Sequence, residues 1–163
     1  MKKLFIVFLV CWLSACGYHL RGAGQTTVKF KKVYLVGASG SLRDGFDEVL
    51  KMSSARLAKN AKEADLQVVV SKEKFNTRSV SLNFSGRSNE SELNYRLEFQ
   101  LAGSGKAELS AGDPLQIIRE YFSDQQDILA KSNEQNVIRR EIYQQAARTI
   151  LERAQARIQA SSK

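Results

Sequence analysis

The chain has 163 residues and a formal net charge of +8, with 25 basic and 17 acidic side chains. This length suits one domain with a single core, and the positive balance permits anionic partners without requiring them. Two cysteines and one histidine argue against a disulfide framework and against a zinc site built on these residue types.

The first fifteen residues have the organisation of a secretory signal peptide. Lys2 and Lys3 form a basic head, and an apolar stretch runs from Leu4 to Leu13 before two small residues. This stretch is much shorter than the roughly 20 residues that a transmembrane helix needs. We therefore predict that residues 1–15 are a signal peptide that is cleaved.

The end of this segment, Leu13-Ser14-Ala15-Cys16, resembles the bacterial lipobox. The resemblance implies cleavage before Cys16, diacylglycerol on its thiol and an acyl chain such as palmitate on its amine. Two or more acyl chains hold a protein lastingly on a bilayer. Because Gly17 follows in place of the aspartate of an inner-membrane retention signal, the resemblance implies the periplasmic side of the outer membrane. The alternative is an ordinary cleaved signal that happens to contain a cysteine.

Export would change the charge of the chain, the cysteines available for chemistry and the partners that the protein can meet. Cleavage leaves 148 residues with a side-chain charge of +6. Cys11 would leave with the signal and Cys16 would carry lipid, so neither an internal disulfide nor cysteine-based catalysis is expected. The anionic molecules of the envelope, chiefly lipid head groups and lipopolysaccharide phosphates, then replace nucleic acid as candidate partners. A mixed, solvated surface explains the same charge equally well.

The first part of the mature chain predicts a tether, a strand and a helix. Residues 16–32 are rich in Gly and Thr and predict a tether, so we place the single folded domain at residues 33–163. Val33–Val36 predicts a short buried strand. Ser41–Asp44 resembles a capping box, which predicts a helix from Ser41 to about Asn60. One face of that helix would carry Phe46, Val49, Leu50 and Leu57.

The middle of the chain predicts strands. Leu66–Phe75 reads as one strand that continues past a bend near Asn76, and alternating segments on either side of a turn at Ser85–Asn89 predict a hairpin. Ala102–Pro114 predicts a loop that leads into a strand over Leu115–Phe122. The expected buried faces of the hairpin carry Val80, Leu82 and Phe84, then Leu93, Tyr95, Leu97, Phe99 and Leu101.

The last segment predicts a long helix. Ser132-Asn133-Glu134-Gln135 resembles a second capping box, and apolar residues then share a helical face to about Ile158. These residues are Ile138, Ile142, Ala146 and Ile150. The order of elements is typical of an α+β fold, a two-layer sandwich with two helices packed on one face of a mixed sheet of four or five strands.

The sequence nominates no catalytic or metal site. His19 lies three positions from the predicted lipid, and the neighbouring acids Asp124 and Asp127 are interpreted as turn and cap residues. Neither a nucleophile elbow nor a phosphate loop is present. We therefore expect no enzyme, no cofactor and no metal. A hydrolase whose acids are brought together only by the fold stays open as an alternative.

Three segments together resemble one family, the lipopolysaccharide-assembly lipoproteins LptE, also called RlpB. They are Cys16–Arg21, the strand pair around Arg87 and Asn94–Leu97, and Tyr121–Asp124 followed by Ile128–Gln135 and Glu141–Tyr143. The resemblance implies the two-layer fold described above. It also implies a lipoprotein that sits in the lumen of the LptD β-barrel, helps the barrel assemble, plugs it and binds lipopolysaccharide.

The resemblance also suggests residue roles. Lys131 matches a family lysine that contacts the phosphorylated lipid A part of lipopolysaccharide, and Arg87 matches an arginine of the hairpin turn. His19 and Arg21 would meet head groups near the anchor. The alternative for each residue is a solvated surface cation. A structural envelope lipoprotein that acts as a tether or spacer, without binding lipopolysaccharide, is the alternative function.

Overall fold

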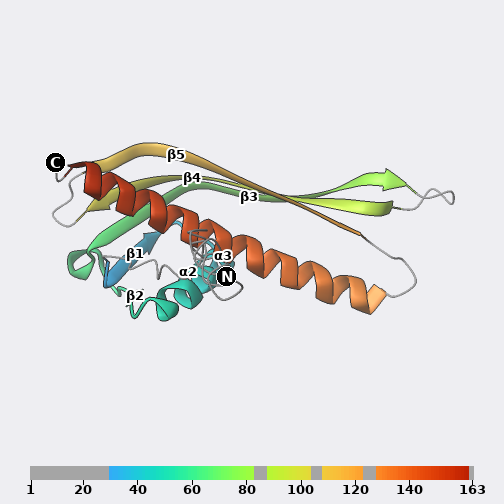
Figure 1. The fold of residues 1–163 in the computed structure, drawn as a ribbon, viewed down its shortest axis with the longest axis horizontal. Coiled ribbons are helices and arrows are strands. Elements are labelled where there is room, and N and C mark those ends of the chain that lie inside the picture. The colour runs from blue at the N-terminus through green and yellow to red at the C-terminus, as the bar shows by residue number, and fades with distance from the viewer. Residues whose placement is uncertain (1–29, 83–87, 104–107, 123–127, 162–163) are drawn as a thin grey trace, which may run out of the picture.

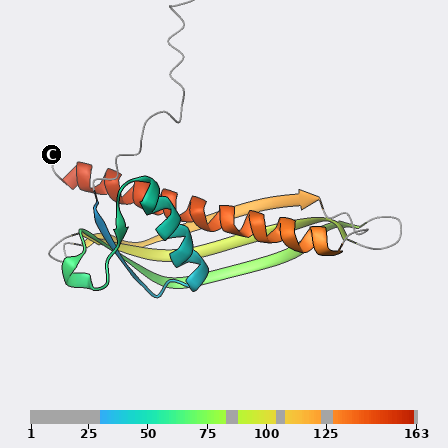
Figure 2. The ribbon, with the colours of Figure 1, turned by 90° about the horizontal axis from the view of Figure 1, so that it is seen from below.

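The computed structural model describes residues 30–82, 88–103, 108–122 and 128–161. Two helices, α2 (Gly40–Met52) and α3 (Ile128–Ser161), lie on one face of a five-stranded sheet (Figure 1, Figure 2). The α+β prediction is therefore confirmed, with five strands. Neither described helix combines the length and the apolar composition needed to cross a bilayer.

The sheet is mixed, with strand order β2-β1-β3-β4-β5. The short strands β1 (Lys32–Val36) and β2 (Arg56–Leu57) pair in parallel, and β1 also pairs in parallel with the start of β3 (Leu66–Leu82). β4 (Ser88–Gly103) and β5 (Glu108–Phe122) continue as an antiparallel meander. The three long strands extend well beyond β1 and β2 (Figure 1).

The core lies between the sheet and the helices. The five β4 residues predicted to share a buried face are each at most 2% exposed: Leu93, Tyr95, Leu97, Phe99 and Leu101. From the helices, the core receives Leu42, Phe46 and Leu50 of α2 and Ile142, Ala146 and Ile150 of α3. The periodicities therefore correctly identified the buried face of β4 and, except for Leu42, these helical core residues.

The predicted first helix is wrong at both ends. Ser39, and not Ser41, caps it, because the Ser39 hydroxyl accepts a hydrogen bond from the Leu42 N–H at 3.2 Å. The helix stops at Met52, and the chain turns through Ser54, which has a positive φ of 55°. Leu57 consequently lies in β2, where it pairs with Val33 of β1.

The predictions for β3 need two corrections. β3 runs past Asn76 without a break in its ladder, and its register shifts lie elsewhere, at Val70/Lys72 and beyond Ser79. Val80, predicted to be buried, is 47% exposed because it falls in the shift after Ser79. Phe84 lies outside the described residues, as do residues 85–87 of the predicted turn.

Part of the predicted loop at Ala102–Pro114 is strand. β5 begins at Glu108 and includes Pro114, which pairs with Glu98. Proline is tolerated here because β5 is an edge strand, where one side of the backbone needs no ladder partner. Gly112, with a φ of +126°, takes up the register shift opposite Gln100.

The starts of α3 and of the folded domain also differ from the prediction. α3 begins at Ile128, so Ser132–Gln135 lies inside the helix and does not cap it. Phe30 is 3% exposed and belongs to the core, and the N–H groups of Lys31 and Lys32 donate to Asp65 Oδ2 at 2.8 and 3.0 Å. The end of the segment predicted as a tether is thus folded into the domain.

Candidate functional site

The predicted site residues are only partly within the described chain. Cys16, His19, Arg21 and Arg87 lie outside it, as do Asp124 and Asp127. The backbone of Lys131 lies in the first turn of α3. Arg87 immediately precedes β4, which begins at Ser88. In both ribbon views the starts of α3 and β4 lie at the same end of the molecule (Figure 1, Figure 2).

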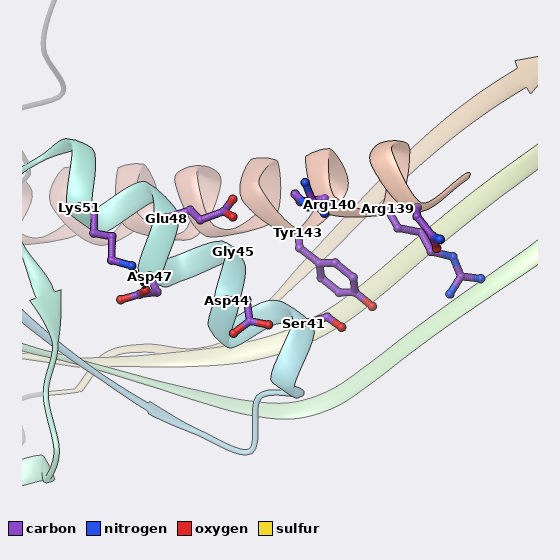
Figure 3. Close-up of a pocket in the computed structure, with 10 residues that line it drawn as sticks. Ser41, Asp44, Gly45, Asp47, Glu48, Lys51, Arg139, Arg140 and Tyr143 are labelled. Atoms are coloured by element: carbon purple, nitrogen blue, oxygen red, sulfur yellow. Dashed lines mark ion pairs between the residues drawn. The ribbon is translucent and has the colours of Figure 1, made fainter. Parts of the chain in front are cut away.

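A polar groove of about 810 Å³ separates α2 from the middle of α3 (Figure 3). One wall is α2, which contributes three acids and one lysine. The other is α3, which contributes two arginines, an asparagine and a tyrosine. The lining residues are Ser41, Asp44, Gly45, Asp47, Glu48, Lys51, Asn136, Arg139, Arg140 and Tyr143.

Gly45 sets the distance between the two helices at the floor of this groove. A Cβ atom built on Gly45 would lie 2.9 Å from both the carbonyl carbon and the oxygen of Tyr143. Carbon atoms in contact rest about 3.5–4.0 Å apart. The helices can therefore approach this closely only because residue 45 has no side chain.

An aromatic cluster lies where α3 meets β3 and β4. The ring centroids of Tyr95 and Tyr143 are 5.1 Å apart in an edge-to-face arrangement, and Phe75 lies 5.7 and 5.9 Å from them. The Arg139 guanidinium covers Phe75, with Cζ 4.5 Å from the ring centroid. Its Nε is buried and makes no hydrogen bond within the described chain, and the contact with the ring helps to position this arginine.

Glu73 links this cluster to the start of α2. Its carboxylate accepts hydrogen bonds from the Ser39 N–H at 2.9 Å, the Ser39 hydroxyl at 2.7 Å and the Tyr95 hydroxyl at 2.9 Å. A carboxylate is favourable at this position because the N-terminus of a helix carries partial positive charge. Burial and then Glu73 raise the pKa of both Tyr95 and Tyr143, so these hydroxyls stay protonated to a higher pH than a free tyrosine.

Most charges in the groove have partners. Asp47 pairs with Lys51 at 2.6 Å, which raises the pKa of that lysine, and Glu48 accepts a hydrogen bond from Gln144. The close-up shows Tyr143 projecting between the helices with its hydroxyl toward Ser41 (Figure 3). Opposite charges cancel across the lining, so the groove has no strong preference for ligands of either sign.

The described residues contain no group of three or more His, Cys, Asp or Glu side chains arranged to hold a metal ion. The groove carries hydroxyls, amides and ion pairs but neither a histidine nor a cysteine. Arg139, Gly45 and Phe75 were missed at the level of sequence, because no local pattern distinguishes them from ordinary helix and strand residues.

The family model described as "LptE: Lipopolysaccharide-assembly" matches residues 27–154. The chain belongs to the LptE family. Among curated relatives, the LPS-assembly lipoprotein LptE of Pectobacterium atrosepticum is 27% identical over 157 residues, which cover 91% of this chain and 83% of the relative. The Yersinia pestis protein of the same name is 24% identical over 153 residues and covers 91% and 72%.

Solved structures of similar lipoproteins share the fold. Lipoprotein B of Nitrosomonas europaea is 25% identical with a TM-score of 0.65 and covers 89% of this chain and 93% of that one. The rare lipoprotein B of Shewanella oneidensis is 24% identical with a TM-score of 0.64 and covers 81% and 99%. Two helices on one face of a mixed sheet are therefore the LptE-type architecture in this chain.

Proposed function

We propose that this chain is an outer-membrane lipoprotein that assembles lipopolysaccharide at the cell surface together with the LptD β-barrel. It would help the barrel assemble, plug its lumen and bind lipopolysaccharide, and it would have no enzymatic activity of its own. The observation that carries this proposal is the match of the LptE family model to most of the folded domain.

The membrane attachment rests on the first residues of the chain. Residues 1–15 would be removed during export, and lipid on Cys16 would hold the protein on the periplasmic side of the outer membrane. Mass spectrometry of the purified protein tests this step directly. The expected mass is that of residues 16–163 with diacylglycerol and one further acyl chain. An unmodified thiol, or a chain that still begins at Met1, would contradict it.

We propose Lys131 and Arg87 as the lipopolysaccharide ligands. Arg87 adjoins β4 and Lys131 lies in the first turn of α3, and these two element ends share one end of the molecule (Figure 1). A guanidinium offers a planar fork to phosphate oxygens and an ammonium offers a compact point charge, so the two together suit the phosphates of lipid A.

Copurification tests the partner. The protein, tagged after Lys163 and extracted from outer membranes in detergent, should bring down a β-barrel protein at an equal molar ratio. Recovery of the lipoprotein without a barrel would count against the proposal.

Charge reversal tests the ligand site. We expect Lys131→Glu combined with Arg87→Glu to abolish lipopolysaccharide binding, while copurification with the barrel persists. The matched control is Lys59→Glu with Lys62→Glu, which reverses two exposed cations between β2 and β3. A spacer without a ligand site would show no binding to lose, and equal losses in both double variants would indicate a general charge effect.

A further inference from the structure

The face of the sheet turned away from the helices carries a pair of cations that is separate from the groove in Figure 3. Lys74 of β3 and Arg96 of β4 stand directly opposite each other in the antiparallel register, and both are exposed. Tyr95 and Leu97 are buried on the helix side, so alternation turns Arg96 to the open face. We call Lys74 and Arg96 the central pair. Like charges directly opposed in neighbouring strands destabilise a sheet, so the fold retains a repulsive contact here.

The nearest acids on this face already have cations of their own. Lys72 Nζ donates to Glu98 Oε1 at 3.2 Å. Arg78 donates from Nε and Nη2 to both oxygens of Glu92, at 2.9 and 2.8 Å. These two ion pairs flank the central pair along the ladder. Each flanking acid is therefore matched by a cation of its own, so this part of the face keeps a net positive charge even though Glu92 also interacts with Arg96.

The central pair borders a hollow of about 1000 Å³. Gln116 of β5 stands opposite Arg96 and lines the same hollow, as does Pro114. In the orientation that satisfies both ends of the Gln116 amide, its oxygen accepts hydrogen bonds from Nε and Nη2 of Arg96, each at 3.1 Å. A neutral amide therefore orients the guanidinium, and the acid that Arg96 influences, Glu92, is already hydrogen-bonded to Arg78.

We propose that the central pair binds a phosphate group in this hollow. Opposed side chains begin about 4.5–5.5 Å apart, so two long cationic side chains can converge on one anion. A phosphate monoester carries about −1.5 to −2 charges at pH 7, which matches two cations better than the single charge of a carboxylate. The ammonium and the free edge of the guanidinium donate to different phosphate oxygens.

This site is distinct from the proposed lipopolysaccharide ligands. Along β4, Arg96 lies eight residues from Ser88, which corresponds to roughly 27 Å of strand. The proposal therefore does not depend on Lys131 or Arg87. A phosphate group that can carry two charges is present in inorganic phosphate, in phosphatidic acid and in the phosphates of a glycolipid, whereas the phosphodiester of phosphatidylglycerol carries one charge and should bind more weakly.

Thermal unfolding of the full lipoprotein in a nonionic detergent tests phosphate binding. At constant ionic strength, inorganic phosphate should raise the Tm of the wild type, because a ligand that binds only the folded state stabilises it. Lys74→Gln with Arg96→Gln should remove this response and, without phosphate, unfold at the same or a higher temperature because repulsion is relieved. The control Lys59→Gln with Lys62→Gln should respond like the wild type. The proposal would be refuted if phosphate left the Tm of the wild type unchanged, or if phosphate still raised the Tm of the Lys74→Gln, Arg96→Gln variant.

Calorimetric titrations distinguish a phospholipid from a phosphorylated glycolipid as the source of the phosphate group. The probes are dihexanoyl phosphatidic acid and dihexanoyl phosphatidylglycerol below their micelle concentrations, and lipopolysaccharide with and without its lipid A phosphates. The central-pair variant should lose at least about tenfold in affinity for phosphatidic acid if the source is a phospholipid, or for phosphorylated lipopolysaccharide if it is a glycolipid. If neither affinity changes and only a protein partner is lost on copurification, the face binds acidic protein and the phosphate proposal is wrong. If Lys131 and Arg87 turned out not to bind lipopolysaccharide, phosphate would still raise the Tm through the central pair. The two proposals can therefore be refuted independently of each other.

Discussion

Replacing Gly45 by alanine should push α2 and α3 apart. The new methyl group would lie 2.9 Å from two backbone atoms of Tyr143 and 3.1 Å from its Cβ. Backbone atoms cannot rotate out of the way as the end of a flexible side chain can. Because contacting carbons rest about 3.5–4.0 Å apart, the helices must separate by roughly half an ångström or more.

The expected cost follows from two opposing effects. Overpacking of a close contact costs about 1–3 kcal/mol, and the backbone character of this contact favours the upper half of that range. The substitution also raises the free energy of unfolding by about 1 kcal/mol, because alanine is a better helix former than glycine. Gly45→Ala should therefore lower the free energy of unfolding by about 1–2 kcal/mol. Gly40→Ala in the same helix meets nothing within 4 Å and should be neutral or stabilising by up to about 1 kcal/mol.

Thermal unfolding of the two variants side by side measures this difference. For a domain of this size 1 kcal/mol corresponds to about 3–6 °C in Tm, so a difference of about 1–3 kcal/mol should make Gly45→Ala unfold roughly 3–18 °C below Gly40→Ala. Both variants replace glycine by alanine in α2, so the comparison chiefly reports the helix contact, with a smaller gain in helix propensity at Gly40, the first helical residue. If Gly45→Ala were as stable as Gly40→Ala, the close approach of the two helices in the groove would be wrong.

Three further predictions concern hydrogen-bonded acids and hydroxyls. Arg78 lowers the pKa of Glu92, so the wild type should lose stability as pH falls below about 4.5, and Arg78→Gln should flatten that dependence of Tm on pH; equal slopes would contradict the ion pair. Burial raises the pKa of Tyr143, so its contribution is present below about pH 10 and lost above it; Tyr143→Phe should weaken alkaline unfolding followed by circular dichroism. Glu73→Ala should cost about 1–3 kcal/mol in urea unfolding by leaving the buried Tyr95 hydroxyl without an acceptor, whereas Glu73→Gln should cost less.

The sequence predicts the core more reliably than the element boundaries. Alternation identified the buried face of β4, and the 3.6-residue period identified the inner faces of α2 and α3, because burial depends on repeating patterns. Leu57 fits a helical period equally well, and nothing local shows that it pairs with Val33. The extension of β5 through Pro114 depends on its place at the edge of the sheet, which is set by the whole topology.

Some candidate site residues could be predicted from the sequence, whereas others could not. Cys16 and Lys131 stand out from linear motifs that can be compared with a family. Lys74 and Arg96 lie 22 positions apart and become neighbours only through the register of β3 and β4. That register includes a shift after Val70, and without the shift Lys74 would face a different residue of β4. A one-residue change in pairing moves every side chain to the other face, so this pair could not be predicted from the sequence alone.

The two ends of α3 are held differently, and this bears on how Lys131 is presented. Near its C-terminal end, Arg153 donates to the Pro114 carbonyl at 2.9 Å, and Arg157 donates to Asp113 at 2.9 Å. Toward its start, the helix lies away from the strands (Figure 1). A helix rises about 1.5 Å per residue, so Lys131 lies roughly 10 Å beyond Ile138, which still packs against the core. The position of Lys131 therefore depends on helix rigidity over the two turns that precede this first core contact. If Lys131 binds lipopolysaccharide as proposed, Arg139→Gln should weaken that binding without touching the ligand, because it removes the contact with Phe75 near the start of the helix. Arg157→Gln, at the far end beyond the buried residues Ile142 and Ile150, should leave the binding unchanged.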